Sequence, residues 1–277
     1  MFAHAQLIRW VMVFTLLASL LTSHSVNADV DAGVQAYKDE DYPTAYTEFL
    51  AAAVAGDALA QYLVGSMHED GLGTAQDDGS AVRWYERAST QGDAEGSFAL
   101  AQMLLSGRGI DRDDERAANL IRSAADAGHH GAMNALGTLY IQGRTVARSS
   151  TDAAKWYQKA GKGYQPDAWY NLAQLYLAGD GVTENPSTAL QLYRKAAFSG
   201  HPGAAVNLAY MYANGLATAP DYIRAYGWLA LARLKQQEVV EANLVILQDR
   251  MTDAEIEQGE AFAEELAAEV RRLGPTN

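Results

Sequence analysis

The feature that most constrains this chain is a repeat of 36 residues that runs through most of its length. The segments WYERA (Trp84–Ala88) and WYQKA (Trp156–Ala160) lie 72 residues apart, which is two such periods. Over five copies, similar residues recur at this spacing in the columns that begin at Val64, Gly71, Ala81, Trp84 and Ala88. A period of this length indicates small units that stack side by side and bury their apolar faces against one another.

Each unit contains two helical patterns joined by a short polar loop. In the third copy, apolar residues recur every three or four positions from Ala132 to Tyr140, and Gly143 is placed to end that helix. The spacing returns from Ala153 to Ala160, with Trp156 and Tyr157 between them. The alanine columns allow close helix approach, and the aromatic columns fill the space between pairs. The sequence therefore predicts an all-α solenoid of antiparallel helix pairs.

The repeat also predicts boundaries along the chain. We expect a partial repeat at 29–55, five repeats of 36 residues at 56–233, and a helical cap at 234–277. Within the cap, Met251–Arg272 has the pattern of one amphipathic helix, and Thr252 with Glu255 forms a capping box at its start.

Loop residues predict where several helices begin. Asn185 is a good N-cap before Pro186 at the first helical position, and Pro202 is expected to begin the next helix in the same way. The glycine between repeats is shifted by one position at Gly163, which predicts an adjusted turn before Pro166.

Two segments of the third copy carry a resemblance to a known family. ALGTLYIQG (Ala135–Gly143) and DAAKWYQKA (Asp152–Ala160) resemble the Sel-1-like repeat, a relative of the tetratricopeptide repeat. The resemblance covers about Asp31–Arg233, and the second copy departs from it, with Leu120–Ile121 in place of Trp–Tyr. It implies a right-handed superhelical solenoid, with a C-terminal capping helix here, that binds other proteins.

The first 28 residues have the layout of a secretory signal peptide. Arg9 precedes the twelve-residue apolar run Trp10–Leu21, and Val26 and Ala28 suit a cleavage site. The alternative is an uncleaved anchor, but a membrane helix needs about 20 apolar residues. We expect cleavage near Ala28, a mature chain without a stable membrane anchor, and a periplasmic or secreted location.

Composition excludes several classes of function. The chain has no cysteine, which rules out disulfides, thiol catalysis and lipid attachment at a cysteine. Its formal net charge of -13 disfavours nucleic-acid partners, because an acidic surface repels phosphate.

No group of residues has the pattern of a catalytic, metal or cofactor site. His129 and His201 occupy matching positions two repeats apart, too far to share a metal, and His68 is expected to pack inside the fold. The motifs GLG, GRG and GDG recur at the repeat period and lack the preceding strand of a dinucleotide site, so they predict turns. Asp111–Glu115 lacks the order of a calcium loop and predicts helix-starting acids.

The first helix of each repeat has three columns that point away from the core, those of Asn134, Thr138 and Ile141. The columns also run through Val206 and Ala213 in the fifth copy. Two interpretations remain open: extra packing between neighbouring first helices, or a concave groove for a peptide or partner helix. The candidate groove residues are Tyr62, Phe98, Gln102, Leu105, Asn134, Thr138, Ile141, Tyr170, Gln174, Leu177 and Tyr210.

These observations predict a non-enzymatic scaffold or adaptor whose partner is a protein, with roles in signalling, envelope assembly or motility all open. Two alternatives remain: a periplasmic hydrolase that acts on cell-wall material or β-lactams, and a secreted effector that binds host proteins.

Overall fold

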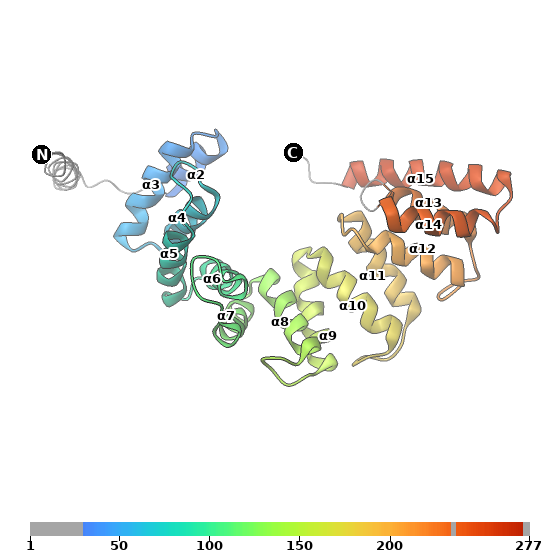
Figure 1. Cartoon of the computed structure of the whole chain (residues 1–277), viewed down its shortest axis with the longest axis horizontal. Coiled ribbons are helices and arrows are strands. Elements are labelled where there is room, and N and C mark those ends of the chain that lie inside the picture. The colour runs from blue at the N-terminus through green and yellow to red at the C-terminus, as the bar shows by residue number, and fades with distance from the viewer. Residues whose placement is uncertain (1–29, 234–236, 274–277) are drawn as a thin grey trace, which may run out of the picture. The chain divides into compact units, whose positions relative to one another are not determined.

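The computed structural model describes residues 30–233 and 237–273, which form fourteen α-helices and one short 3-10 helix without any strand. The helices are α2 (Val30–Lys38), α3 (Tyr42–Ala55), α4 (Ala58–Asp70), α5 (Asp78–Thr90), α6 (Ala94–Ser106), α7 (Asp114–Asp126), α8 (His130–Gln142), α9 (Ser150–Ala160), η1 (Gly161–Gly163), α10 (Pro166–Ala178), α11 (Pro186–Phe198), α12 (Ala204–Asn214), α13 (Tyr222–Ala232), α14 (Gln237–Gln248) and α15 (Asp253–Leu273). Consecutive helices pack against one another from α2 to α5 and from α7 to α14 (Figure 1).

The chain divides into two compact units. The first holds the described residues up to Gly96 together with Gly107–Asp111, and the second holds Ser97–Ser106 and the described residues from Arg112 onward. In the first unit α2 packs on α3 and α4 on α5, and in the second α8 packs on α9, α10 on α11 and α12 on α13. The predicted all-α solenoid of helix pairs is confirmed.

The alanine column is completely buried in the helix pairs. Because a methyl group adds so little bulk, each of these alanines lies against the neighbouring helix with no solvent exposure at all. Its members are Ala45, Ala81, Ala117, Ala153, Ala189 and Ala225, each 0% exposed. A larger side chain at any of them would force the helices apart.

Helix ends follow the predicted chemistry in most repeats. Gly143 ends α8 in the left-handed conformation, with φ 64°. Asn185 caps α11 and accepts a hydrogen bond from the Thr188 amide at 3.0 Å, with Pro186 at the first helical position. The shifted glycine belongs to η1, after which Tyr164 adopts a left-handed conformation, so the adjusted turn is confirmed.

The prediction that Pro202 begins a helix is wrong. Helix α12 begins two residues later, at Ala204. The Gly203 amide donates to Nδ1 of His201 at 3.2 Å, and this local turn takes the place of the first helical residues.

The C-terminal region contains two helices, one more than the sequence indicated. The predicted helix is α15, and its capping box is confirmed: the Thr252 amide donates to Glu255 Oε2 at 2.8 Å, and the Glu255 amide donates to Thr252 Oγ1 at 3.3 Å. The buried residues of α14, Val240, Leu244 and Leu247, lie 36 residues after Ala204, Leu208 and Met211 and so continue the repeat columns. Helix α14 was missed because Met251 stands where each earlier copy has its helix-ending glycine.

Helix α15 packs along α13, and both helices use a glycine to approach closely (Figure 1). A Cβ atom on Gly227 would lie 2.5 Å from the Phe262 ring, and one on Gly259 would lie 2.7 Å from the Tyr226 ring. Helix α14 makes its helix contacts with α13 as well. The predicted signal peptide, its cleavage site and Asp29 lie outside the described residues. No helix among the described residues is long and apolar enough to cross a membrane.

Candidate functional site

A tyrosine on the second helix of three repeats extends toward the first helix of its own pair. Tyr85, Tyr157 and Tyr193 occupy one repeat column and are each at most 3% exposed. A Cβ atom added to Gly65 or Gly137 would lie 2.6 Å from the ring of Tyr85 or Tyr157, respectively. The rings therefore fill the space beneath the first helices, and their hydroxyl groups reach the face where the groove was predicted.

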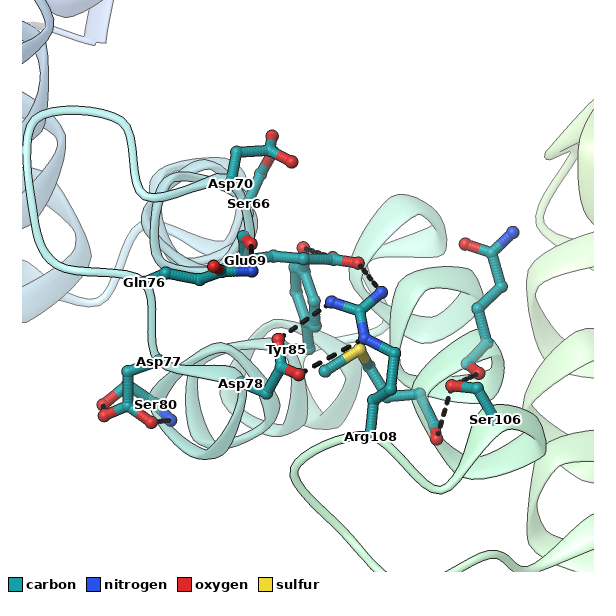
Figure 2. A network of polar contacts seen from close by, with 12 residues as sticks. Ser66, Glu69, Asp70, Gln76, Asp77, Asp78, Ser80, Tyr85, Ser106 and Arg108 are labelled. Atoms are coloured by element: carbon teal, nitrogen blue, oxygen red, sulfur yellow. Dashed lines mark hydrogen bonds and ion pairs between the residues drawn. The ribbon is translucent and has the colours of Figure 1, made fainter.

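In the first unit, this face is closed by a polar network (Figure 2). The Tyr85 hydroxyl donates to Glu69 Oε2 at 2.7 Å. Arg108, from the loop after α6, donates to Glu69 Oε1 at 2.9 Å and to Asp78 Oδ1 at 2.8 Å. Burial, and secondly the bond to Glu69, hold the pKa of Tyr85 far above its usual range, so the hydroxyl remains a donor. The network ties α4, α5 and the next loop together.

Three aromatic residues predicted to line the groove contact other rings instead of standing free. Tyr62 stacks on Tyr85 with ring centroids 5.9 Å apart. Phe98 lies 4.6 Å from His129, the N-cap of α8, and Tyr170 lies 4.0 Å from His201, just before α12. Each ring therefore packs beside a neighbouring element of the solenoid.

The remaining predicted residues of the middle repeats also lie between helices or in solvent. Asn171 donates to Asn134 Oδ1 at 3.1 Å, which joins two successive first helices. Thr138 Oγ1 lies 3.2 Å from the Tyr157 hydroxyl. Gln102 and Gln174 are exposed, whereas Leu105, Ile141 and Leu177 are half-buried. Whether these side chains bind a partner or only pack stays a prediction.

A pocket does occur at the end of the predicted columns, between α12, α13 and α14. It has a volume of about 330 Å³, at the lower end of the range of about 300–1,000 Å³ for ligand pockets. Helix α12 contributes the columns of Asn134, Thr138 and Ile141 in their fifth copy. The lining residues are Val206, Asn207, Ala209, Tyr210, Ala213, Asn214, Ala225, Leu229, Asn243, Ile246, Leu247 and Arg250. Tyr210 is the candidate groove residue that lies in this pocket.

Leu229, which lines the pocket, stands where three other repeats have tyrosine. In those repeats, the aromatic ring and hydroxyl reach the first helix, but a leucine side chain ends short of that position. Leu229 is 4% exposed and forms part of the pocket floor with Ala225. This break is visible in the sequence, where the column reads Tyr85, Ile121, Tyr157, Tyr193 and Leu229. The lining residues on α14 continue the columns of α12, with Ile246 36 residues after Tyr210, but Met251 in place of the helix-ending glycine hides this further copy.

Large apolar side chains are exposed around the pocket. Tyr210 and Ile246 line it and are each 57% exposed, and Val245, the neighbour of Ile246 on α14, is also 57% exposed without lining the pocket. Exposed apolar surface of this kind beside a cavity is typical of binding sites.

The motifs considered for chemistry have structural roles. Gly71 and Gly73, of GLG, both have left-handed backbone conformations, as turns require. Asp113 caps α7, with the Arg116 amide 2.9 Å from Oδ1, as predicted for this acidic run. His68 packs edge-on against Tyr46, as predicted. No cluster of three metal-ligating side chains occurs within the residues that the structure covers.

Comparison with known proteins identifies the repeats. The family model of the Sel1 repeat matches five consecutive segments, residues 58–93, 94–129, 130–163, 166–201 and 202–235. The chain belongs to the Sel1 repeat family. Sel1 repeat proteins are generally non-enzymatic scaffolds that bind other proteins, and the predicted resemblance is confirmed. No curated protein matches this chain.

Two solved Sel1 repeat structures are similar to this one. A Sel1 repeat protein from Oxalobacter formigenes has a TM-score of 0.75 at 26% identity, over 86% of this chain and 96% of that one. A protective antigen of uropathogenic Escherichia coli strains, which displays the same fold, has a TM-score of 0.58 at 22% identity. The match covers 84% of this Sel1 repeat chain and 58% of that antigen.

Proposed function

We propose that this Sel1 repeat protein is an exported, non-enzymatic adaptor that binds a segment of a partner protein in the pocket between α12, α13 and α14. The observation that carries the proposal is the cavity of about 330 Å³ where the Tyr210 and Leu229 columns meet α14. A volume of this size receives one or two side chains. It therefore suits an extended peptide segment, or one face of a short helix, better than a polysaccharide strand.

Two adjacent residues of α14 offer a matched pair of variants. Ile246 and Val245 are equally exposed, but Ile246 lines the pocket and Val245 does not. A photo-crosslinking amino acid at position 210, introduced in the native host, should give one discrete protein adduct. Ile246→Asp should abolish that adduct, because it places a charged carboxylate where an apolar side chain of the partner would be buried. Val245→Asp should leave it unchanged.

The result that contradicts the proposal is equal behaviour of the two variants, with circular dichroism showing that both remain folded. In that case α12 and α14 do not form the binding surface. Hydrolysis of peptidoglycan or a β-lactam by the purified protein would instead support the alternative of a periplasmic hydrolase.

The proposed location rests on the sequence of the first 28 residues. We expect the mass of the mature protein to correspond to a chain that begins at Asp29, and the protein to appear in the periplasmic fraction. Accumulation in the culture medium would favour the secreted effector, and a full-length mass in the membrane fraction would contradict cleavage.

A further inference from the structure

Arg250 gives the pocket a charge opposite to that of the chain as a whole. It is the one charged residue among those that line the pocket, and its side chain is exposed. The chain has 34 acidic and 21 basic residues. A single cation at the edge of a mostly apolar cavity therefore stands out against an acidic surface, and it attracts groups of negative charge.

The guanidinium group of Arg250 has no ion pair or hydrogen bond with any residue that the structure describes. Two arginines on or next to α13 behave differently: Arg224 pairs with Asp221 at 3.2 Å, and Arg233, just after the helix, lies 3.9 Å from Glu241. Arg250 thus has its five hydrogen-bond donors available for a ligand, and their planar arrangement matches a carboxylate.

The spacing of Arg250 and the apolar lining constrains the ligand further. Ile246 lies in the last turn of α14, and Arg250 lies two residues beyond the end of this helix, in a turn where its amide donates to the Leu247 carbonyl at 3.0 Å. Both residues line the same pocket. In an extended peptide, side chains two residues apart lie on one face, about 7 Å apart. An apolar side chain and a carboxylate at this spacing would meet Ile246 and Arg250 together.

We propose that the pocket recognises an extended acidic segment in which a bulky aliphatic residue and an Asp or Glu are separated by one residue. This inference rests on the proposed function, which it deepens by naming the chemistry of the partner. The aliphatic side chain enters the space above Leu229, and the carboxylate pairs with the Arg250 guanidinium. Asn207, Asn214 and Asn243 also line the pocket, and the Asn214 amide donates to the Tyr210 carbonyl at 2.8 Å.

The test is a selection from a library of random displayed peptides on the purified, immobilised full-length protein, followed by affinity measurement on the selected peptides. We expect enrichment of Leu, Ile or Val two positions from Asp or Glu. Arg250→Gln should weaken the selected peptides about tenfold, the loss of one charge-assisted contact. Arg122→Gln, which removes an exposed arginine from α7, is the matched control and should have no effect.

Charge reversal provides the sharpest result. Selection on Arg250→Glu should yield Lys or Arg at the position where the unaltered protein selects Asp or Glu, while the aliphatic position is retained. Peptides that are lost with Ile246→Asp but show no acidic enrichment and no response to Arg250→Gln would overturn this inference and leave the proposed function standing.

Failure of the proposed function itself would look different. In that case no selected peptide would distinguish Ile246→Asp from Val245→Asp. A third outcome, a concentration-dependent dimer in sedimentation that Ile246→Asp dissolves, would identify a second copy of this chain as the occupant and overturn the acidic peptide.

Discussion

Two helix pairs of this protein occupy the same place in the repeat but present different surfaces. In the α4–α5 pair, Tyr85 reaches the first helix and joins Glu69 and Arg108 in a network that closes the face. In the α12–α13 pair, four repeats later, Leu229 stands in the tyrosine position and a pocket opens beside Tyr210. The comparison teaches that a repeat can change its surface at one column while the packing of its alanine column remains complete.

The largest expected effect on stability comes from replacing Tyr85 or Leu229, which occupy the same column in the two pairs, by alanine. Tyr85→Ala should lower the free energy of unfolding by about 3–5 kcal/mol, because it leaves a cavity beneath Gly65. Leu229→Ala should lower it by about 2 kcal/mol, since Leu229 already borders open space. Urea unfolding followed by circular dichroism measures both. Equal losses would show that the tyrosine and leucine fill their sites equally well, which would contradict a difference in packing between the two pairs.

Placing a tyrosine at position 229 tests whether Leu229 creates the pocket. Leu229→Tyr should fill the cavity, as Tyr193 does beside Ala173 in the preceding repeat, and reduce peptide binding at least tenfold. The free energy of unfolding should change by less than about 1 kcal/mol, because the space for the ring exists already. The control is Leu229→Met, which has similar volume and should retain binding. Unchanged binding by a folded Leu229→Tyr variant would place the binding surface elsewhere.

The polar network around Arg108 should contribute less to the free energy of unfolding than the buried ring of Tyr85. The Arg108 side chain is 44% exposed, so its pairs with Glu69 and Asp78 are screened by solvent. Arg108→Gln should lower the free energy of unfolding by less than about 1 kcal/mol, and 0.5 M salt should shrink the difference. Thermal unfolding at low and high salt provides the measurement, and a large, salt-independent loss would contradict solvent screening.

The smallest expected effect is a dependence of stability on pH that comes from His201. Burial lowers the pKa of His201, and this outweighs the opposing effect of Asp167, whose Oδ1 lies 3.5 Å from Nε2. Because the unfolded chain binds the proton more readily, stability should be complete above about pH 6.5 and decline as the pH falls below it. Protonation also removes the Nδ1 acceptor that holds the Gly203 amide.

The matched variant for this test is His201→Asn, which keeps a side-chain acceptor but does not titrate. Thermal unfolding between pH 7.5 and 5 should show a shallower decline for this variant than for the unaltered protein. Identical slopes would mean that other groups determine the acid sensitivity of the fold.

Repetition made most of the fold predictable. The column of Ala81 indicates that two helices approach closely, and the column of Gly71 indicates a left-handed helix end. Both are local properties that residue type and spacing predict. Where the pattern weakened, prediction became harder: α14 keeps the apolar columns but has Met251 in place of the glycine that ends the earlier first helices. Pro202 suited a helix start, but the bond between Gly203 and His201 delayed α12.

The candidate site was only partly predictable for a related reason. The sequence by itself determined the stacked helix pairs, because small and aromatic residues at a fixed period leave few other ways to bury them. It also indicated which columns face away from the core. Only the tertiary structure decided that Tyr62, Phe98 and Tyr170 pack against neighbouring rings whereas Tyr210 lines a cavity. That outcome depends on the volume left by Leu229 and on α14, and both are properties of how separate segments meet in space.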